Sequence, residues 1–214
     1  PAVAHAPHDL ATAVAVSPDF AHDGLVFAQF HLIDQRVFGR STDGGATWHE
    51  LGLPMAERTV LEFAFSPAFA ADGTAFACTD GGGVYRTRDR GLSWQALHAG
   101  LGSLQVRDLA VSPAFAVDGV VLLATAAGLW RTDDQGDSWS DGSLGLGERA
   151  LTSVTFAPDD AALAYCAGAT LHASVDGGQS WTARQAFGDD VLEIACSPQH
   201  AADGRLALAL RTTG

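Results

Sequence analysis

One eight-residue pattern occurs four times in this chain at nearly constant spacing, and this regularity restricts the possible folds more than any other feature. The pattern is [ST]-x-D-x-G-x-[ST]-W, and its tryptophans are separated by 46, 45 and 42 residues. Its fixed positions are Ser41, Asp43, Gly45 and Trp48; Thr87, Asp89, Gly91 and Trp94; Thr132, Asp134, Gly136 and Trp139; and Ser174, Asp176, Gly178 and Trp181. A period of this length indicates a repeat architecture in which each repeat is one small structural unit.

A second pattern, Ser-Pro-x-x-Ala-x-Asp-Gly, lies in phase with the octet. It occurs at 17–24, 66–73, 112–119 and 197–204, and a degenerate copy occupies 157–164. Together the two patterns predict one domain, 1–214, with repeats at about 9–54, 55–101, 102–146 and 147–188 and a partial fifth repeat at 189–214.

Each repeat is predicted to contain four short strands. In the second repeat they are Thr59–Phe65, Thr74–Thr79, Gly83–Arg88 and Ser93–Leu97, and Gly, Pro or Asp-Gly bounds each run, as in an antiparallel meander. Four-stranded units of this length, arranged radially, are the blades of a β-propeller. A parallel solenoid is the competing architecture, although its coils are usually shorter. We therefore expect an all-β propeller segment with four full blades and about half of a fifth.

The octet is predicted to form the turn between the third and fourth strands of each repeat. Its Asp carboxylate accepts backbone N–H groups, as in an Asx turn, and its Gly supplies a positive φ. Its Trp is expected to fold back against the blade as an apolar plug. In the first three repeats an arginine lies three residues before the box Asp, and it is expected to reach an Asp in the connection between the first and second strands. These arginines are Arg40, Arg86 and Arg131, and the alternative interpretation is a row that binds an anion.

The Ser-Pro-x-x-Ala-x-Asp-Gly segment is predicted to connect the first and second strands. Pro ends the first strand, and Asp-Gly reverses the chain into the second. Three aromatic residues, Phe20, Phe69 and Phe115, are expected to pack beneath their blades.

The repeated octet resembles the Asp box of the BNR repeat family, and the resemblance covers nearly the whole chain. That family includes sialidases, some glucan hydrolases, sortilin-type receptor ectodomains and photosystem II assembly factors. The resemblance implies that the box is a structural hairpin remote from the ligand site. Binding of calcium or another ligand by the box is the alternative interpretation.

The charge and composition exclude several classes of partner. The formal net charge is −13, with twelve arginines and no lysine, so nucleic acid and anionic membrane are not expected partners. No run of eighteen apolar residues is present, and no membrane span is expected. Cys78, Cys166 and Cys196 lack CxxC spacing and are predicted to be buried free thiols, while the histidines are scattered, so no cofactor or metal is expected.

Acidic residues recur where the first strands are expected to enter a central channel. The position five residues before the repeat proline is occupied by Ala13, Glu62, Asp108, Ser153 and Glu193. The nearby arginines are Arg58, Arg107 and Arg149. One interpretation is a negative ring at the channel mouth that binds a cation or a basic segment. The other is a set of solvated acids or acids paired with these arginines.

Enzyme signatures are weak in this sequence. A sialidase-like site would require an arginine triad and a tyrosine nucleophile, but only Tyr85 and Tyr165 are present, and neither is expected at the channel mouth. An acid pair for inverting glycoside hydrolysis would have to come from Glu62, Asp108 and Glu193, and no two of them are singled out. We therefore expect no catalytic activity in this segment.

The sequence thus favours a non-catalytic scaffold that binds a protein partner. The resemblance places it outside the cytoplasm, as a secreted, periplasmic or cell-surface protein. A glycan-binding or sialidase-like hydrolase propeller is one alternative, and an assembly factor for a membrane or photosynthetic complex is another. Because four and a half blades leave exposed strand edges, we expect either further blades in a longer chain, to a total of six to eight, or self-association of two copies.

Overall fold

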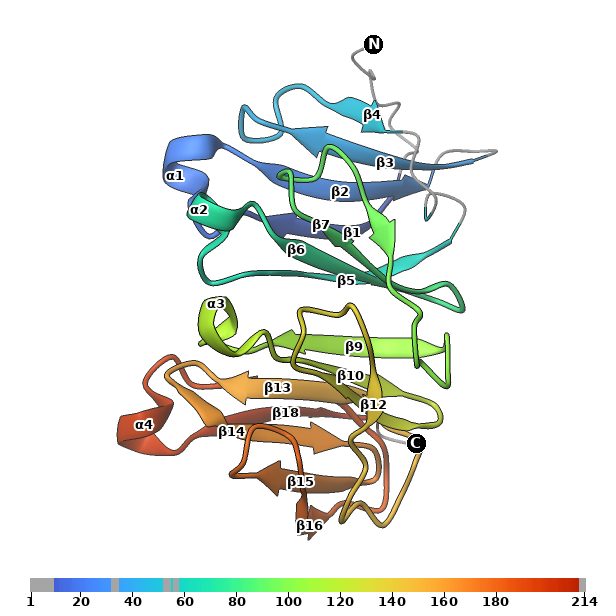
Figure 1. Ribbon diagram of the computed structural model, residues 1–214, viewed down its shortest axis with the longest axis vertical. Helices are drawn as coiled ribbons and strands as arrows, with labels where there is room; N and C mark the ends of the chain where they lie inside the picture. Colours follow the sequence, from blue (N-terminus) through green and yellow to red (C-terminus); the bar gives the residue numbers. More distant parts are fainter. Residues whose placement is uncertain (1–9, 32–34, 52–54, 56–57, 212–214) are drawn as a thin grey trace. The chain divides into compact units, whose positions relative to one another are not determined.

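The computed structural model describes residues 10–31, 35–51, 55 and 58–211 (Figure 1). The chain divides into two compact units, Pro1–Leu97 and His98–Gly214. The described residues of the first unit form two four-stranded sheets, and those of the second form two four-stranded sheets and one two-stranded sheet. All strand pairs are antiparallel and join neighbours along the chain, so the predicted meander units are confirmed.

The first unit contains one sheet for each of the first two repeats. Each sheet follows chain order, β1-β2-β3-β4 and β5-β6-β7-β8. The first sheet is formed by β1 (Leu10–Val16), β2 (Val26–His31), β3 (Arg36–Ser41) and β4 (His49–Leu51). The second is formed by β5 (Val60–Phe65), β6 (Ala75–Thr79), β7 (Gly83–Thr87) and β8 (Gln95–Ala96). Strands β1 and β5 pack against each other, so the two sheets share a core.

The second unit repeats this arrangement. Its third sheet is formed by β9 (Val106–Val111), β10 (Val121–Thr125), β11 (Gly128–Thr132) and β12 (Ser140–Asp141). Its fourth is formed by β13 (Ser153–Ala157), β14 (Asp160–Ala167), β15 (Thr170–Ser174) and β16 (Thr182–Ala186). The two-stranded sheet pairs β17 (Val191–Cys196) with β18 (Leu206–Leu210). Strand β13 packs against both β9 and β17.

The connection between the first two strands contains a helical turn that the sequence analysis did not predict. The turns are α1 (Phe20–Asp23), α2 (Phe69–Asp72), α3 (Phe115–Asp118) and α4 (His200–Asp203). In the first, the Ser17 hydroxyl donates to the Asp23 carboxylate at 2.8 Å, and Gly24 ends the turn at φ 55°. The predicted Asp-Gly reversal into the second strand is present, and the helical turn directly precedes it. In the described residues, no helix is long and apolar enough to cross a membrane.

The second strands form the centres of both cores. In the first unit, Phe27 lies among Phe38, Phe63, Phe65 and Trp94, with ring centroids 5.4–5.9 Å apart. Burial of each such ring contributes about 1.5–3 kcal/mol. In the second unit, β10 is buried along its whole length.

The three connection phenylalanines do not behave alike. Phe69 and Phe115 are buried, as predicted, but Phe20 is 39% exposed. The expectation that all three pack beneath their blades was therefore wrong for Phe20.

Candidate functional site

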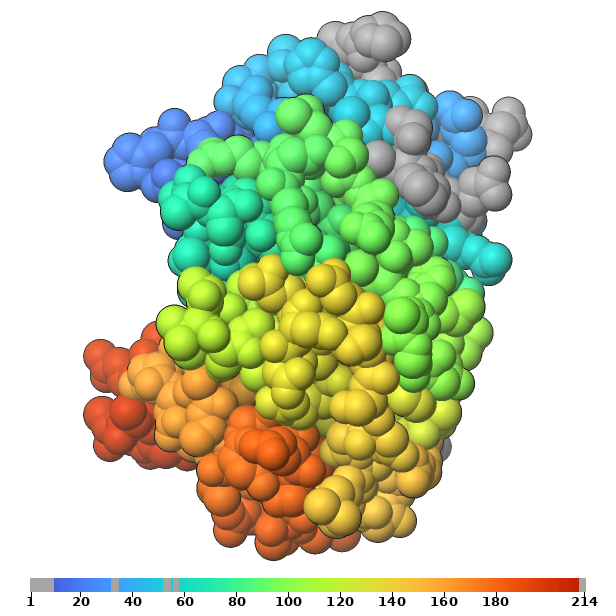
Figure 2. Space-filling view, in the orientation of Figure 1, coloured from blue at the N-terminus to red at the C-terminus, as the bar shows by residue number. Residues whose placement is uncertain are grey.

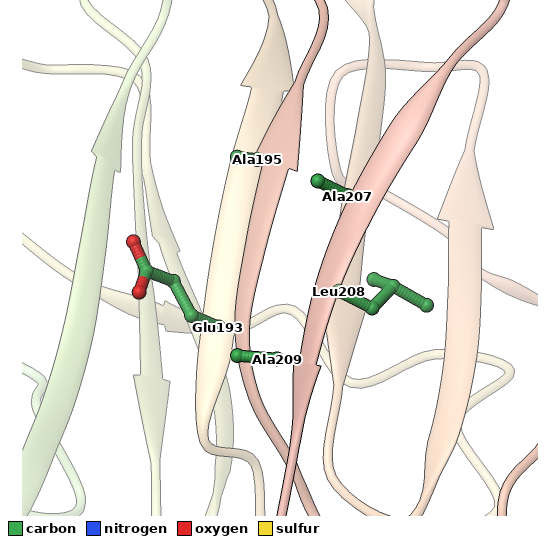
Figure 3. A pocket seen from close by; sticks show the side chains of 5 residues that line it. All are labelled: Glu193, Ala195, Ala207, Leu208 and Ala209. Atoms are coloured by element: carbon green, nitrogen blue, oxygen red, sulfur yellow. The ribbon is translucent and has the colours of Figure 1, made fainter.

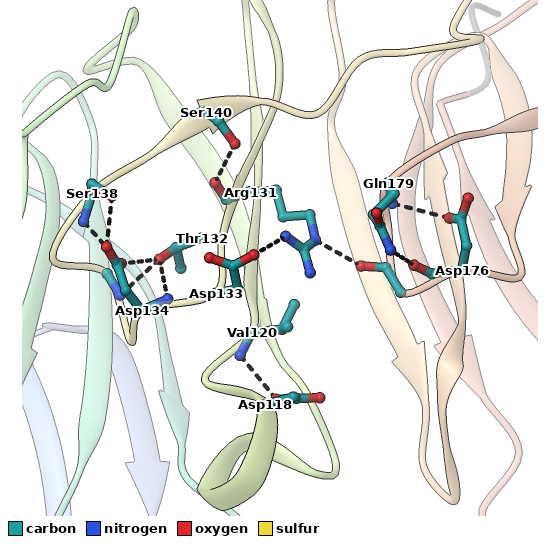
Figure 4. Close-up of polar contacts among 12 residues, drawn as sticks. Asp118, Val120, Arg131, Thr132, Asp133, Asp134, Ser138, Ser140, Asp176 and Gln179 are labelled. Carbon is teal, nitrogen blue, oxygen red and sulfur yellow. Dashed lines mark hydrogen bonds and ion pairs between the residues drawn. The ribbon is translucent and has the colours of Figure 1, made fainter.

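The four octets form hairpin turns whose hydrogen bonds are the same in every copy. In the third, the Asp134 carboxylate accepts the Thr132 hydroxyl at 2.6 Å, the Ser138 amide at 2.9 Å and the Ser138 hydroxyl at 2.6 Å (Figure 4). The Thr132 hydroxyl in turn accepts the Gly136 amide at 3.0 Å. Equivalent bonds surround Asp43, Asp89 and Asp176. Each carboxylate is thus engaged within its own turn.

These hydrogen bonds also lower the pKa values of the box aspartates. For Asp134 and Asp176, burial opposes the charged form, but hydrogen bonds from the flanking hydroxyl and amide groups outweigh it and bring the pKa to about 2. For Asp43, the Thr47 and Ser41 hydrogen bonds bring the pKa to about 2. A carboxylate that stays ionised in this way is suited to holding a turn, not to donating a proton.

Two of the box tryptophans, Trp94 and Trp181, pack between neighbouring sheets. Trp94 contacts Phe27 and Phe38 of the preceding sheet, with ring centroids 5.6 and 5.8 Å away. The Trp181 indole donates to the carbonyl of Gly142 at 3.0 Å. Trp48, in the first sheet, is only half-buried. The indole therefore joins two sheets, a role that its own repeat does not reveal.

The third-strand arginines also bridge sheets. Arg40 Nε donates to the carbonyl of Arg90 at 2.8 Å, and Arg131 Nε donates to the carbonyl of Gly177 at 3.1 Å. Both acceptors directly follow the box Asp of the next sheet, and Figure 4 shows Arg131 between Asp133 and that turn. The connection aspartate Asp23 lies 3.5 Å from Arg90 instead. The predicted bond from these two arginines to a connection aspartate is thus replaced by a bond to the backbone. Arg86 is buried and takes part in an interaction of its own.

The candidate acids sit beside irregularities in the first strands. The pairing register shifts between Val60 and Glu62, opposite Asp108, and between Val191 and Glu193. A bulge of this kind changes the direction of the following side chain. Each acid therefore leaves the regular alternation of its strand.

Asp108 is used to join two sheets. Its Oδ2 accepts the amide of Val154 at 2.8 Å, and its Oδ1 accepts the amide of Leu109 at 2.7 Å. Ser153, at the equivalent position, accepts the amide of Ile194 at 3.1 Å in the same manner. This position thus attaches one sheet to the next.

Glu62 and Glu193 have different surroundings. Glu62 is half-buried on β5 of the first unit and takes part in a polar interaction. Glu193 is exposed, and it lines an open hollow with Ala195, Ala207, Leu208 and Ala209 (Figure 3). Asp108 and Glu193 both belong to the second unit. Of these two acids, Asp108 accepts a hydrogen bond from the neighbouring sheet, whereas Glu193 lines the hollow.

The candidate arginines have different hydrogen-bond partners. Arg107 donates to the carbonyl of Leu151 at 3.2 Å, and Arg149 pairs with Asp141 at 2.9 Å at an exposed position. The carbonyl of Arg58 accepts the Gln29 side-chain amide at 2.6 Å. No three His, Cys, Asp or Glu residues within the described ranges are arranged to hold a metal ion.

The thiols and tyrosines are placed as parts of the fold. Cys78 and Cys166 are buried and Cys196 is half-buried, and none of the three forms a disulfide. Burial raises the pKa of Cys166 well above its usual range and that of Cys196 to about 11, which suppresses the reactive thiolate. Tyr85 is buried, and the Tyr165 hydroxyl lies 3.2 Å from His200 Nε2.

Comparisons with known proteins agree on the architecture. No protein-family model and no curated protein matches this sequence. A GH74 xyloglucanase from Xanthomonas campestris is similar in structure, with a TM-score of 0.68 and 24% identity over 98% of this chain and 35% of that chain. The Niastella koreensis GH74 enzyme gives 0.65 and 16%, over 94% of this chain and 33% of its own. An ancestral GH74 enzyme gives 0.60 and 19%, over 89% and 24%.

The chain has a β-propeller fold. It spans 24–35% of the length of those three proteins, and identities below 25% establish the fold alone. The four-stranded sheets are therefore blades, and the two-stranded sheet is part of a fifth.

Two polar residues with structural roles were missed in the sequence analysis. Gln29 is fully buried in β2, and its Oε1 accepts the amide of Val60 in the second blade at 2.8 Å. Glu148 accepts the amides of Ala169 and Thr170 at 3.1 and 2.9 Å. The signal for Gln29 was a lone amide in the apolar strand VFAQF. Glu148 lies outside both repeated patterns, so its role had no counterpart in the other repeats.

Proposed function

We propose that this chain supplies Asp-box blades to a non-catalytic propeller that serves as a scaffold for binding another protein. The main support is the position of Asp108, the candidate acid whose surroundings are best defined. Its carboxylate holds the Val154 amide at 2.8 Å and so links two blades. A carboxylate engaged in this way is poorly available to protonate or attack a substrate.

The neighbouring polar groups support the same proposal. Ser153 links the fourth blade to the fifth, and Arg107 links the third to the fourth through Leu151. Arg131 reaches the fourth blade through the carbonyl of Gly177. The polar chemistry described in the second unit is therefore largely used in blade attachment.

The charge of the chain suggests the chemistry of its partner. A net charge of −13 favours a partner with a basic surface, because complementary potentials speed association and select the partner. We place this scaffold outside the cytoplasm, on the basis of the Asp-box resemblance. An assembly factor that docks a basic subunit is one form of the same function.

The absence of lysine makes a direct test possible. A zero-length carbodiimide reagent joins carboxylates to amines, and this chain offers no lysine amine. In the full-length protein in its native host, cross-links from these blades must therefore lead to the N-terminal amine or to a lysine outside the chain. The proposal predicts cross-links to a lysine-rich surface of one partner, weakened by added salt. Cross-links that are spread over unrelated proteins and insensitive to salt would contradict it.

A glycan-active propeller is the second candidate, because the exposed Glu193 lines an open hollow. It predicts release of reducing sugar from xyloglucan or a sialoside, with loss of that activity in Glu193→Gln. The scaffold proposal predicts no turnover in the wild-type full-length protein under the same conditions. Measured turnover that disappears in Glu193→Gln would overturn it.

A further inference from the structure

The outer edge of β18 is the side of this strand that faces away from β17. In the described ranges 10–31, 35–51, 55 and 58–211, this strand pairs only with β17. Ser197 donates to the carbonyl of Arg205, and Arg211 donates to the carbonyl of Asp190, so odd-numbered residues bond toward β17. Because antiparallel strands alternate, the amides of the even-numbered leucines of β18 point away from β17. They are Leu206, Leu208 and Leu210.

A backbone acceptor lies next to this edge. In each complete blade, the residue that ends the first connection accepts the amide of the residue after the box Asp. The bonds are Gly44 to Gly24 at 2.9 Å, Arg90 to Gly73 at 3.1 Å, Gln135 to Gly119 at 3.0 Å and Gly177 to Ala162 at 2.9 Å. Gly204 occupies this position after α4 and is exposed. The red segment that includes α4 lies at the surface of the second unit (Figure 2).

The space around the glycine that ends the first connection differs between the complete blades and Gly204. A Cβ added at Gly24, Gly73 or Gly119 would meet backbone atoms of the octet turn at 2.9–3.2 Å. A Cβ added at Gly204 would meet no atom of the described residues within 4 Å. Gly204 therefore presents its backbone at the position where the other blades seat an Asp box.

A second backbone acceptor lies at the end of the fourth blade. Trp139 donates its amide to Ala99, and Trp181 donates its amide to Leu144, each at 2.9 Å. The glycine that follows each acceptor, Gly100 or Gly145, has a positive φ, and a Cβ there would clash with the tryptophan carbonyl oxygen. Phe187 and Gly188, at φ +83°, form the next such pair, and no described atom lies within 4 Å of a Cβ at Gly188.

We propose that the β18 edge, Phe187–Gly188 and Gly204 form an acceptor surface for a β-hairpin that carries a further Asp box. The expected contacts continue the interface between the third and fourth blades by one blade. The hairpin's first strand pairs with β18, the amide after its Asp binds Gly204, and its Trp amide binds Phe187. Its box Gly faces Tyr165, because a Cβ added at Gly178 would meet the equivalent residue of the preceding blade, Leu122.

The occupant is a hairpin other than the four present in this chain, because each of those already uses its own connection carbonyl. One contact of the other blades is missing here. Ala173 stands where Arg40 and Arg131 donate to the next box turn. We therefore expect the hairpin to be held by backbone bonds and by its indole. This inference rests on the scaffold role, because it names one segment that the scaffold binds.

The probe is a fluorescent peptide that copies residues 128–142, GLWRTDDQGDSWSDG, and binding is measured by anisotropy. We expect saturable binding, with an affinity at least about tenfold weaker for the matched peptide in which the box Trp is replaced by Ala. Binding that does not saturate by about 1 mM, or that is equal for the two peptides, would overturn the inference.

Substitutions in the chain test whether the peptide binds at the proposed acceptor surface. Gly188→Ala is expected to weaken peptide binding at least about tenfold, since its methyl group would meet the tryptophan carbonyl of the docked hairpin. Gly44→Ala is the control, because Gly44 also has a positive φ, 73°, and a Cβ there makes only an ordinary contact with Phe20 at 3.6 Å, outside the acceptor surface. Circular dichroism checks that both variants fold. Equal binding by folded Gly188→Ala and the control would contradict the inference.

Sedimentation and cross-linking separate the remaining outcomes. A dimer of the chain that the peptide cannot dissociate would show that a second copy covers this edge, and would overturn the inference. Loss of peptide binding together with intact cross-links to a basic partner would also overturn it, while the scaffold proposal would stand.

Discussion

Comparing substitutions at the buried indoles of Trp181 and Trp94 measures how much the hydrogen bond from Trp181 to Gly142 contributes to stability. Both side chains are about equally buried, at 5% and 6% exposure. The Trp181 indole donates to Gly142, whereas the Trp94 Nε1 has no hydrogen-bond partner within the described ranges. Replacing either with Phe removes a similar volume of ring, but only Trp181→Phe also breaks a hydrogen bond.

The expected costs follow from these contacts. Trp181→Ala should lower the free energy of unfolding by about 3–5 kcal/mol, since it leaves a large cavity between two blades. Trp181→Phe should cost about 1–3 kcal/mol more than Trp94→Phe, because the buried carbonyl of Gly142 loses its donor. Trp94→Phe removes an unsatisfied buried donor, which offsets part of its lost packing.

The assay is urea unfolding followed by far-ultraviolet circular dichroism, which does not depend on the tryptophan that is removed. The slope of the transition must be unchanged for the two Phe variants to be compared. A Trp94→Phe variant that is destabilised as much as Trp181→Phe, or more, would refute the claim that the indole bond joins the third and fourth blades.

Two further predictions concern the carboxylates. The pKa of Asp134 is lowered from 3.8 to about 2, so its contribution to stability is complete above pH 3.8 and is lost as the pH falls toward 2. Asp134→Ala should therefore be less stable than wild type at pH 6 and approach it near pH 2, and a constant difference in melting temperature across this range would contradict the reasoning. Asp108→Ala should cost about 1–3 kcal/mol because the buried Val154 amide loses its acceptor, whereas Asp108→Asn retains an acceptor oxygen. Equal unfolding free energies for these two variants in urea would argue against the bond.

The repeats allowed the blades to be predicted because they encode local structure. Asp43 and its counterparts organise turns of eight residues, and the spacing of the tryptophans defines the four-stranded unit. The strands predicted in the second repeat match β5 to β8 within two residues at each end. The conformation of each turn is therefore determined by residues within the octet itself.

The contacts between blades were harder to predict, because no sequence spacing specifies them. Arg40 was expected to bind a connection aspartate, but the next blade presents a backbone carbonyl at a suitable distance. Asp108 was considered as part of a channel-mouth charge, and the bulge beside it directs its carboxylate to Val154. Side chains at blade junctions depend on how two repeats pack, which the pattern of one repeat does not contain.

The most direct test of the account is the hydrogen-exchange rate of the amides that cross between blades, measured by nuclear magnetic resonance in the native chain. Trp139, Val154, Trp181 and Ile194 each donate an amide to another part of the fold across a blade junction in the second unit. The account predicts that these amides are protected to the same degree as those of β10. Exchange at these four positions as fast as that of exposed loop amides would contradict the claim that polar groups are used to attach the blades.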